Sequence, residues 1–335
     1  MRAYALAGFD RMPEFIEVAE PRPAPGEILI KVEATSVNPV DALVVAGFFR
    51  TVQQYRFPAV IGRDVSGVVA RVGAGVVNFA VGDPVFGFIK RDYIGDGTFA
   101  EYVTCPSDQF VAARPAAVSP VQAGVLGLSS ITAQECLDEL IVKEGDTILV
   151  NGATGGVGSF AVQLAVDRGL RVIATARGAE GAAYVRGLGA HEVVDWTGDL
   201  EGAITRIAPG GVDALVDLVR RDASTVIGMD ETPAQRAFAT FARSVVRPGG
   251  SLTSLTNGAN PAYLGDLIGT NVHSSPTPEA LSRVADAVER GALRAPLCAV
   301  YPFERIAEAF ARQRSGVLGK VAVVIGTEAQ GNRSA

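Results

Sequence analysis

A glycine-rich turn at residues 151–160, NGATGGVGSF, is the stretch whose residue types point most directly to chemistry. It follows an apolar run and opens an amphipathic helix, which is the context in which main chain binds a diphosphate. Gly155 and Gly156 can adopt positive φ and let the backbone approach the phosphates, while Gly158 allows close packing of the helix on its strand. The helix N-terminus adds unsatisfied N–H groups. A tight turn without a ligand is the alternative. The predicted dinucleotide contacts in this turn are Ala153, Thr154, Gly155, Gly156, Val157 and Gly158.

The end of the next apolar strand, RVIATA at residues 171–176, bears on the choice of dinucleotide. A site for NAD usually has an acidic residue here for the ribose 2′-hydroxyl, whereas a cation accommodates the 2′-phosphate of NADP. Arg177 stands in this place, and Tyr184 follows one helix further on. The pattern therefore favours NADPH, with Arg177, Tyr184 and the strand residue Thr175 among its contacts. A solvated surface position for Arg177 is the alternative.

The elements that must position this turn fall into two sequence textures. The first 120 residues read as short strands broken by Gly and Pro, which predicts an irregular, mostly antiparallel β domain. From about residue 121, apolar strands alternate with helical stretches, the pattern of βαβ units in a doubly wound parallel sheet. The elements after residue 276 are short and can return to the first domain. We therefore expect an α/β chain with one domain at 1–122 plus 276–335 and another at 123–275.

Composition and charge exclude several classes of protein. A chain of 335 residues with 48% hydrophobic and 20% charged residues is globular and long enough for two domains. Its net charge of −6 contains no block of like charges, so neither nucleic acid nor an anionic membrane is an expected partner. The sequence shows no signal peptide and no apolar run of about 18 residues, which favours the cytoplasm. Three distant cysteines form neither a disulfide framework nor a CxxC pair.

Eight stretches, spread in order over almost the whole chain, carry a more specific signal than the glycine turn alone. They are SVNPVDALVVAG (36–47), IGRDVSGVVARVGAGVVNFAVGDPVFG (61–87), GTFAEYV (97–103), LSSITAQECL (128–137), VNGATGGVGSFAVQLA (150–165), GLGAHEVVDW (187–196), RPGGSLTSL (247–255) and SGVLGKVAVVI (315–325). With them the chain resembles the medium-chain dehydrogenase/reductase superfamily, in its zinc-independent quinone oxidoreductase and enoyl reductase branch. The resemblance implies a GroES-like β domain with a Rossmann domain inserted before its last elements.

Zinc-dependent alcohol dehydrogenases of that superfamily bind a catalytic metal through a Cys on an early loop and a His-Glu pair. Here the loop reads NPVD at 38–41 and the pair reads RD at 63–64. An arginine cannot ligate zinc, and the four-cysteine lobe of those enzymes is missing from the sequence. We therefore expect no metal site and, without a Lewis acid, no simple alcohol dehydrogenation. The Tyr-x-x-x-Lys pair of the short-chain family is also missing from the sequence.

By the same resemblance, Asn38 lies beside the nicotinamide ribose, Asp64 on the floor of the site, and Thr132 against the nicotinamide from the start of a linking helix. Each has a plainer alternative: Asn38 as an ordinary turn residue, Asp64 as the ion-pair partner of Arg63, and Thr132 as a helix cap. Arg63 is a candidate electrophile in place of a metal, with structural pairing as its alternative. The remaining expected cofactor contacts are Val219 and Lys320.

An aromatic group after the Asn-Pro loop, at residues 48–57, is the expected wall of a flat, apolar substrate slot. Core packing is the alternative. Many relatives carry a tyrosine five positions after this Asn, where the chain has Leu43, so protonation of the reduced substrate would fall to solvent. The aromatic group consists of Phe48, Phe49, Tyr55 and Phe57, and the expected pocket residues are Leu43, Phe48, Phe49, Tyr55 and Arg220.

Two further departures follow the fourth Rossmann strand. The chain has VRR at 219–221 where relatives show Val-Gly-Gly against the nicotinamide. Arg220 and Arg221 either bind an acidic or phosphorylated substrate or obstruct cofactor entry. The stretch at 223–246 is longer than relatives need, and its apolar helical face is expected to cover the cleft or form a subunit contact. That face consists of Phe238, Phe241, Ala242 and Val245.

Together with the resemblance, these patterns predict NADPH-dependent reduction of a quinone or α,β-unsaturated carbonyl by metal-free hydride transfer. One alternative is a biosynthetic tailoring enzyme of the same fold that reduces or cyclises a bulky intermediate, which the arginines at 220–221 motivate. The other is a non-catalytic NADPH-binding protein. The expected partner is a small-molecule substrate, and the resemblance suggests a homodimer through the edge of the Rossmann sheet.

Overall fold

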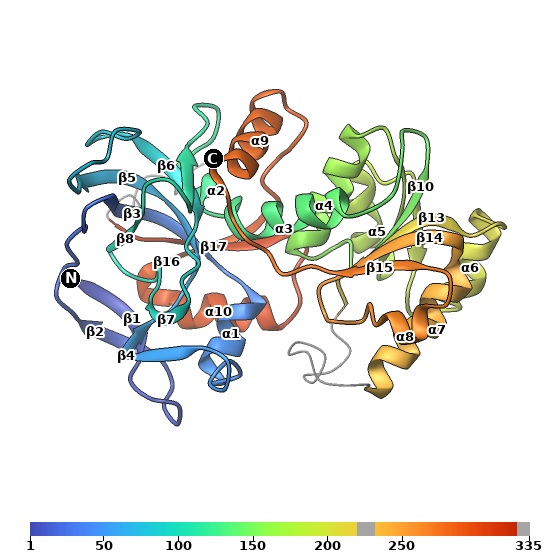
Figure 1. Ribbon diagram of the computed structural model, residues 1–335, viewed down its shortest axis with the longest axis horizontal. Helices are drawn as coiled ribbons and strands as arrows, with labels where there is room; N and C mark the ends of the chain where they lie inside the picture. The colour runs from blue at the N-terminus through green and yellow to red at the C-terminus, as the bar shows by residue number, and fades with distance from the viewer. Residues whose placement is uncertain (220–231, 327–335) are drawn as a thin grey trace. The chain divides into compact units, whose positions relative to one another are not determined.

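The computed structural model describes residues 1–219 and 232–326, and the chain divides into two compact units (Figure 1). Unit 1 holds residues 1–131 together with the C-terminal part from Ser275, and unit 2 holds the stretch between. The division thus falls at residue 132 where the sequence suggested 123. The reason is close packing of residues 124–127 in unit 1: a Cβ at Gly127 would stand 2.2 Å from the carbonyl oxygen of Gly87.

Unit 1 is built mainly from strands. They are β1 (Arg2–Leu6), β2 (Glu14–Glu17), β3 (Glu27–Val37), β4 (Gln54–Val60), β5 (Asp64–Val72), β6 (Pro84–Phe88), β7 (Tyr93–Asp96), β8 (Tyr102–Pro106), β9 (Val111–Ala113), β16 (Leu297–Pro302) and β17 (Lys320–Val324). The helices are α1 (Pro39–Val45), α2 (Pro120–Ala123), α3 (Gly127–Asp138, which runs on into unit 2), α9 (Pro278–Glu289), the 3₁₀ turn η2 (Phe303–Arg305) and α10 (Ile306–Arg314).

The strands of unit 1 form two sheets whose shared core is apolar. The larger runs in the order β16-β17-β3-β5-β6-β9, with β8 paired to β3, and the smaller in the order β2-β1-β4-β7. Most neighbours are antiparallel, as predicted, because Gly- and Pro-rich turns reverse the chain after a few residues. The C-terminal strand β17 pairs antiparallel with β3, so the last elements do return to the first domain.

Unit 2 alternates strands with helices. The strands are β10 (Thr147–Asn151), β11 (Arg171–Ala176), β12 (Glu192–Asp195), β13 (Val212–Asp217), β14 (Val246–Ser254) and β15 (Ile268–Asn271). The helices are α4 (Gly156–Asp167), α5 (Gly178–Gly187), α6 (Leu200–Ile207), α7 (Pro233–Val245) and α8 (Pro261–Leu264). All neighbouring strands described are parallel, in the order β12-β11-β10-β13-β14-β15. This is the predicted doubly wound sheet, and the chain is an α/β protein.

Helix α7 corrects one expectation about the stretch at 223–246. Phe238, Ala242 and Val245 are buried in the core of unit 2 against the parallel sheet, and Phe241 packs beside them. The apolar face is therefore the inner face of an ordinary crossover helix, not a cover for the cleft or a subunit contact. Residues 220–231, and with them Arg220 and Arg221, lie outside the described residues.

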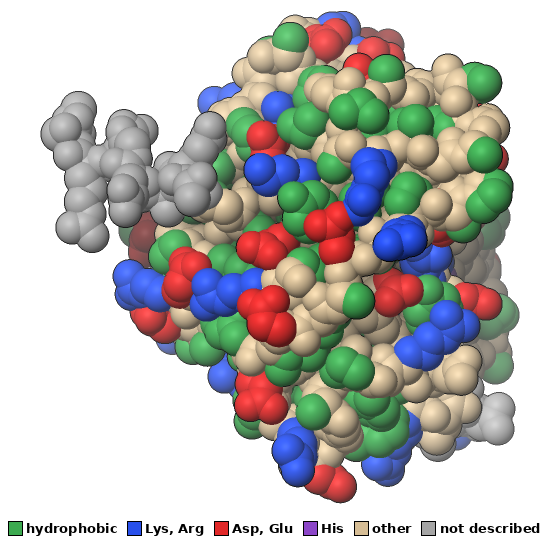
Figure 2. All heavy atoms as spheres, turned by 90° about the vertical axis from the view of Figure 1, so that its left-hand side faces the viewer, with side chains coloured by type: hydrophobic (Ala, Val, Ile, Leu, Met, Phe, Trp, Pro, Cys, Tyr) green, Lys and Arg blue, Asp and Glu red, His purple; other side chains and the backbone are tan. Residues whose placement is uncertain are grey.

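The surface carries charges of both signs. Figure 2 shows Lys and Arg side chains interspersed with Asp and Glu over the face in view. Among the described residues, no helix combines the length and apolar character needed to span a bilayer. The expectations about partners, including the homodimer, stay predictions.

Candidate functional site

The glycine turn of unit 2 has the geometry of a phosphate cradle. Gly152, directly after β10, has φ +90°, which strongly favours glycine. A Cβ at Gly158 would stand 2.2 Å from the carbonyl oxygen of Gly152 and 2.6 Å from Cα of Ala153, both main-chain atoms that cannot move aside. Helix α4 begins at Gly156, and its N-cap residue Gly155 has no side chain to cap the first turn. The free N–H groups and the open approach fit a diphosphate.

A buried hydrogen-bond network holds this turn at the carboxyl edge of the sheet. The Thr175 hydroxyl accepts the N–H of Gly152 at 2.9 Å and donates to Asn151 Oδ1 at 3.2 Å. Asn151 Nδ2 in turn donates to Asp217 Oδ1 at 2.8 Å. Thr175 is 1% exposed, and its hydroxyl stabilises the conformation of the turn through these two hydrogen bonds. Sequence reasoning missed Asn151 and Asp217, although both end neighbouring parallel strands, where sites of this fold lie.

The strand ends beside the turn carry the residues expected to select the dinucleotide. Arg177 is exposed at the N-cap of α5. The neighbouring strand β12 ends at Asp195, whose pKa is held at about 2 by the Thr197 hydroxyl and by the N–H groups of Gly178 and Thr197. The Asp195 side chain is therefore an ionised carboxylate, and it lies near the charge of Arg177. The hydroxyl of Tyr184 lies 2.8 Å from that of Ser159 and ties α5 to the start of α4.

The positions of two other expected cofactor contacts, Val219 and Thr132, do not by themselves indicate contact with a dinucleotide. Val219 is 36% exposed, and its Cγ2 would lie 3.3 Å from a Cβ built on Gly152, so it borders the turn. Thr132 is buried inside α3, which begins at Gly127, and the alternative of a helix cap is therefore wrong. Direct contacts of both residues with a nicotinamide stay predictions.

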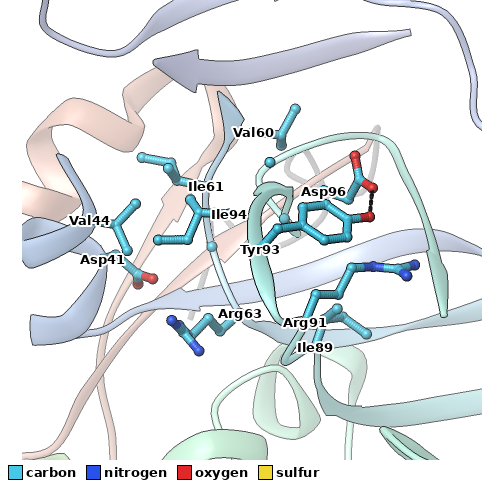
Figure 3. Close-up of a pocket in the computed structure, with 13 residues that line it drawn as sticks. Asp41, Val44, Val60, Ile61, Arg63, Ile89, Arg91, Tyr93, Ile94 and Asp96 are labelled. Carbon is cyan, nitrogen blue, oxygen red and sulfur yellow. Dashed lines mark hydrogen bonds between the residues drawn. The ribbon is translucent and has the colours of Figure 1, made fainter. Parts of the chain in front are cut away.

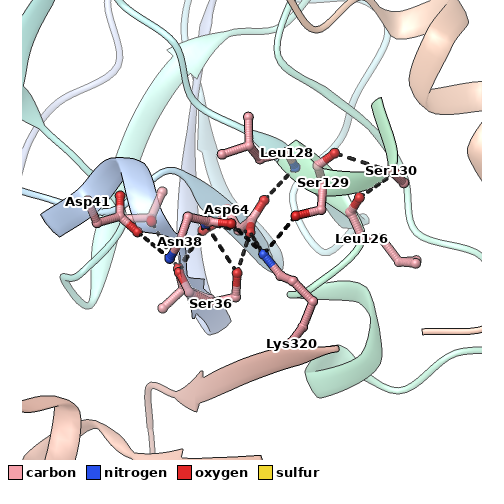
Figure 4. Close-up of polar contacts among 12 residues, drawn as sticks. Ser36, Asn38, Asp41, Asp64, Leu126, Leu128, Ser129, Ser130 and Lys320 are labelled. Atoms are coloured by element: carbon pink, nitrogen blue, oxygen red, sulfur yellow. Dashed lines mark hydrogen bonds and ion pairs between the residues drawn. The ribbon is translucent and has the colours of Figure 1, made fainter. Parts of the chain in front are cut away.

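Unit 1 contributes a polar cluster around Asp64, which is fully buried (Figure 4). Its Oδ2 accepts hydrogen bonds from the Ser36 hydroxyl and from Asn38 Nδ2, the latter at 3.0 Å. Its Oδ1 accepts the main-chain N–H of Leu128 at 2.6 Å. Gly127 makes this last contact feasible, because a Cβ there would stand 2.7 Å from Asp64 Oδ1. The carboxylate thus joins β5 to the Asn-Pro loop and to the start of α3.

Lys320, at the start of β17, is the cation of this cluster. Its ammonium forms an ion pair with Asp64 at 3.1 Å and donates to Ser129 Oγ at 3.2 Å and to Asn38 Oδ1. An ammonium has three N–H donors, and all three bind oxygen atoms of the chain. Lys320 is 3% exposed, so the structure gives it a positioning role, and a direct contact with the cofactor stays a prediction. Asp64 pairs with Lys320 rather than with Arg63, its sequence neighbour.

Arg63 and Asp41 lie close to each other on the wall of a small pocket (Figure 3). Burial lowers the pKa of Arg63, while Asp41, Tyr55 and Asp64 raise it. Asp41 is fully buried, and its Oδ2 accepts the N–H of Asn38 at 2.7 Å. Burial raises the pKa of Asp41 to about 7, against the N–H of Asn38 and the charge of Arg63. In the described part of the chain, the Arg63 side chain donates no hydrogen bond, and its charge interacts with Asp41, Tyr55 and Asp64 through space.

The expected substrate wall divides into two groups of aromatic rings. Phe48 and Phe49 pack edge to face at 5.6 Å between ring centroids. Tyr55 packs at 4.8 Å against Phe9, a residue that sequence reasoning missed, and at 5.8 Å against Phe57. The Tyr55 hydroxyl donates to the carbonyl oxygen of Val44 at 3.0 Å. Phe49 and Tyr55 pack on the core of unit 1, which favours the core-packing alternative, while Leu43 and Phe48 are half-buried.

Other reactive side chains do not assemble into a site. Within residues 1–219 and 232–326, no group of three or more His, Cys, Asp or Glu side chains is placed to hold a metal ion. Burial raises the pKa values of the Cys105 and Cys136 thiols to about 12. Cys298 is an exposed residue, and partial burial of its thiol also raises its pKa. The sequence missed Ser36, Asp41 and Ser129. Asp41 had a signal, since it follows Asn38 at the spacing of a helix capping box.

Both units match known families. The model of the alcohol dehydrogenase GroES-like domain covers residues 24–116, and that of the zinc-binding dehydrogenase domain covers residues 156–273. The chain is 36% identical over 211 residues to the chloroplast envelope quinone oxidoreductase homolog of Arabidopsis thaliana, a match over 61% of this chain and 62% of that protein. It is 28% identical over 334 residues to human quinone oxidoreductase, with 97% of each chain covered.

A solved structure adds a comparison in three dimensions. A mycobacterial protein in complex with NADPH superimposes with a TM-score of 0.79 at 26% identity, over 97% of this chain and 100% of that chain. The glycine cradle, the β domain and these matches define a dehydrogenase of the GroES-like and Rossmann type. The chain belongs to the medium-chain dehydrogenase/reductase superfamily, in its quinone oxidoreductase branch.

Proposed function

We propose that the protein is an NADPH-dependent reductase of quinones or α,β-unsaturated carbonyls that works without a metal ion. The observation that carries this proposal is the cluster around Asp64. At the positions where zinc-dependent members of the superfamily bind metal, this chain has Asn38, Arg63 and Asp64, and both carboxylate oxygens of Asp64 accept hydrogen bonds from the protein. A carboxylate engaged in this way is a poor metal ligand.

A conjugated acceptor suits such a site. The nicotinamide, when bound, supplies a hydride to the distal carbon of the acceptor. The protein must then hold the acceptor in place and stabilise the negative charge that develops on its oxygen. Arg63 is suited to the second task, because its guanidinium is cationic and donates no hydrogen bond in the described part of the chain. The ion pair of Asp64 and Lys320 is suited to the first, because it fixes the Asn-Pro loop and the start of α3.

The preference for NADPH rests on Arg177 and on the relative that was solved with this dinucleotide. Arg177 is exposed at the end of β11, where a 2′-phosphate would lie in this fold. The nearby Asp195 ends the neighbouring strand β12, not β11, where an NAD-selecting acid would stand. Its carboxylate accepts hydrogen bonds from the N–H of Gly178 and the hydroxyl of Thr197.

The test is a panel of acceptors assayed with both reduced dinucleotides. Quinones, enones and enoyl thioesters are each mixed with the protein and NADPH or NADH, and the loss of dinucleotide absorbance is followed. We expect turnover with NADPH and at least one conjugated acceptor, and no turnover with simple ketones. NADPH binding by calorimetry with no turnover across the panel would favour the non-catalytic alternative, and copurifying stoichiometric zinc would contradict the metal-free mechanism.

A further inference from the structure

A small, partly open cavity of about 40 Å³ lies in unit 1, with Asp41 of α1 on its wall (Figure 3). It is close to the Asp64 cluster, because Asp41 on its wall also binds the N–H of Asn38. Its wall combines an aliphatic side with a charged side. The residues that matter here are Val44, Ile61 and Ile94 on the first and Asp41, Arg63 and Arg91 on the second.

Two polar atoms of these wall residues lack a hydrogen-bond partner within the part of the chain that the structure describes. They are Asp41 Oδ1 and Arg91 Nε, and both are buried. Leaving a buried polar group unsatisfied costs about 1–3 kcal/mol, so such atoms are normally met by ordered water. The volume of the cavity has room for about two water molecules. An acceptor from Asp41 and a donor from Arg91 supply partners for them.

The charges around Asp41 come from three elements. Arg63, just before β5, and Asp64, its first residue, act on Asp41 from one side and Lys320 acts from β17, while the N–H of Asn38 comes from the N-cap of Asp41's own helix, α1. Arg63, Lys320 and the N–H favour the carboxylate, and burial and Asp64 oppose it. Burial is the largest effect, and the pKa near 7 leaves the carboxyl partly protonated at neutral pH.

We propose that this cavity holds water and that Asp41, through that water, supplies the proton that completes the reduction. The inference rests on the proposed function and names the proton source for it. Once hydride has added to the distal carbon, the electron pair of the double bond moves to the acceptor oxygen beside Arg63. The O–H bond of Asp41 breaks, a proton passes through water to the reduced acceptor, and solvent protonates Asp41 again through the cavity.

The nearby hydroxyl groups are committed elsewhere. Leu43 stands where, by the resemblance, many relatives carry a tyrosine. The Tyr55 hydroxyl donates to the carbonyl oxygen of Val44, and that of Tyr93 donates to Asp96. Ser36 donates to Asp64. Each of these three hydroxyls has only one proton to donate, so none of them competes with Asp41 as an acid on the wall of the cavity.

The test compares the wild type with Asp41→Asn, which keeps an oxygen for the N–H of Asn38 but cannot donate a proton as an acid. We expect unchanged NADPH affinity and a turnover number at least tenfold lower, in line with general acid catalysis. In the wild type, turnover should fall as the pH rises through about 7, and this limb should vanish in Asp41→Asn. Difference infrared spectroscopy should show a neutral carboxyl band that titrates and is lost in the variant. Asp92→Asn, an exposed acid-to-amide change on the loop after β6, is the matched control and should behave as the wild type.

Each outcome decides between named possibilities. Turnover and pH profile unchanged in Asp41→Asn would overturn the proton role and leave Asp41 as a helix cap, with the proposed function intact. A wild type that oxidises NADPH with none of the acceptors overturns the proposed function itself. If Asp41→Asn does not fold, Ile94→Phe fills the cavity while keeping the carboxyl. That variant should bind NADPH normally and turn over more slowly, and full turnover there would overturn the water path.

Discussion

Replacing Lys320 by methionine tests the central contact of unit 1. The change removes the ammonium but keeps a chain of similar length, so Asp64 stays buried with one charged donor fewer and Asn38 Oδ1 loses its partner. Breaking a buried ion pair by removing one partner typically costs about 3–5 kcal/mol. Since Ser36, Asn38 and Leu128 still donate to the carboxylate, we expect about 3 kcal/mol, near the lower end.

The assay is denaturant unfolding together with scanning calorimetry of Lys320→Met. For a unit of this size, about 3 kcal/mol lowers the transition temperature by about 6–12 °C. In the double variant Asp64→Asn/Lys320→Met both charges leave together, so it should be more stable than Lys320→Met alone. Arg171→Met, which breaks the half-exposed pair with Glu192, is the control and should cost less than about 1 kcal/mol. A transition within about 2 °C of the wild type for Lys320→Met, or a double variant as unstable as the summed single variants, would refute the reasoning.

Four further predictions follow from the two units. Gly158→Ala places a Cβ 2.2 Å from the Gly152 carbonyl oxygen, so we expect calorimetry to detect no NADPH binding by this variant. The control Gly187→Ala, whose new Cβ has nothing within 4 Å, should bind NADPH as the wild type does. Arg177→Ala should raise KM for NADPH about 10- to 100-fold, because one charge-assisted hydrogen bond to the 2′-phosphate is lost, and should leave KM for NADH unchanged. The control Arg186→Ala, on the same helix, should change neither KM. Equal effects of Arg177→Ala on both dinucleotides would contradict the prediction. A thiol reagent should modify Cys298 in the native protein and reach Cys105 and Cys136, whose pKa values burial raises to about 12, only after unfolding; fast reaction of a second thiol would show the buried assignment to be wrong. Because burial raises the pKa of Asp41 from 3.8 to about 7, the folded state binds this proton more tightly than the unfolded state. The stability of the wild type relative to Asp41→Asn should therefore be highest below pH 4 and fall as the pH rises to about 7, by up to about 4 kcal/mol, and a flat difference between the two unfolding curves would contradict this.

The sequence predicted the features that depend on local pattern. The apolar strand, the glycines and the following helix predict the turn at 151–160, because the turn needs a positive φ at Gly152 and close packing at Gly158. The positive φ expected at Gly155 and Gly156 is wrong, since Gly155 has φ −78° and Gly156 already begins α4. The return of the last strand to the first domain followed from its short apolar pattern and is confirmed by the pairing of β17 with β3.

Contacts between distant segments were beyond such reasoning. Asp64 and Lys320 are separated by 256 positions, and no local pattern relates them. The neighbour in sequence, Arg63, was the obvious partner for Asp64, yet successive side chains of an extended chain point to opposite sides. Arg63 therefore faces Asp41 and the cavity, while Asp64 faces the cluster. Thr132 was misplaced for a similar reason, because α3 begins at Gly127, where glycine is needed against Gly87 and Asp64.

Stability alone does not explain why unit 1 keeps a buried ion pair where its zinc-dependent relatives bind a metal. A buried pair replaced by apolar residues of similar volume is often neutral or more stable, since both charges lose their hydration. What the pair does supply is fixed geometry. Through Asp64 and Lys320, two separate segments are held by directional bonds: the Asn-Pro loop through the Asn38 amide, and the start of α3 through the Ser129 hydroxyl and the main chain at Leu128. A metal ion would hold its ligands in a comparable way and would also polarise the acceptor. Under the proposed function the two tasks are separated, with orientation assigned to the ion pair of Asp64 and Lys320 and polarisation of the acceptor to Arg63.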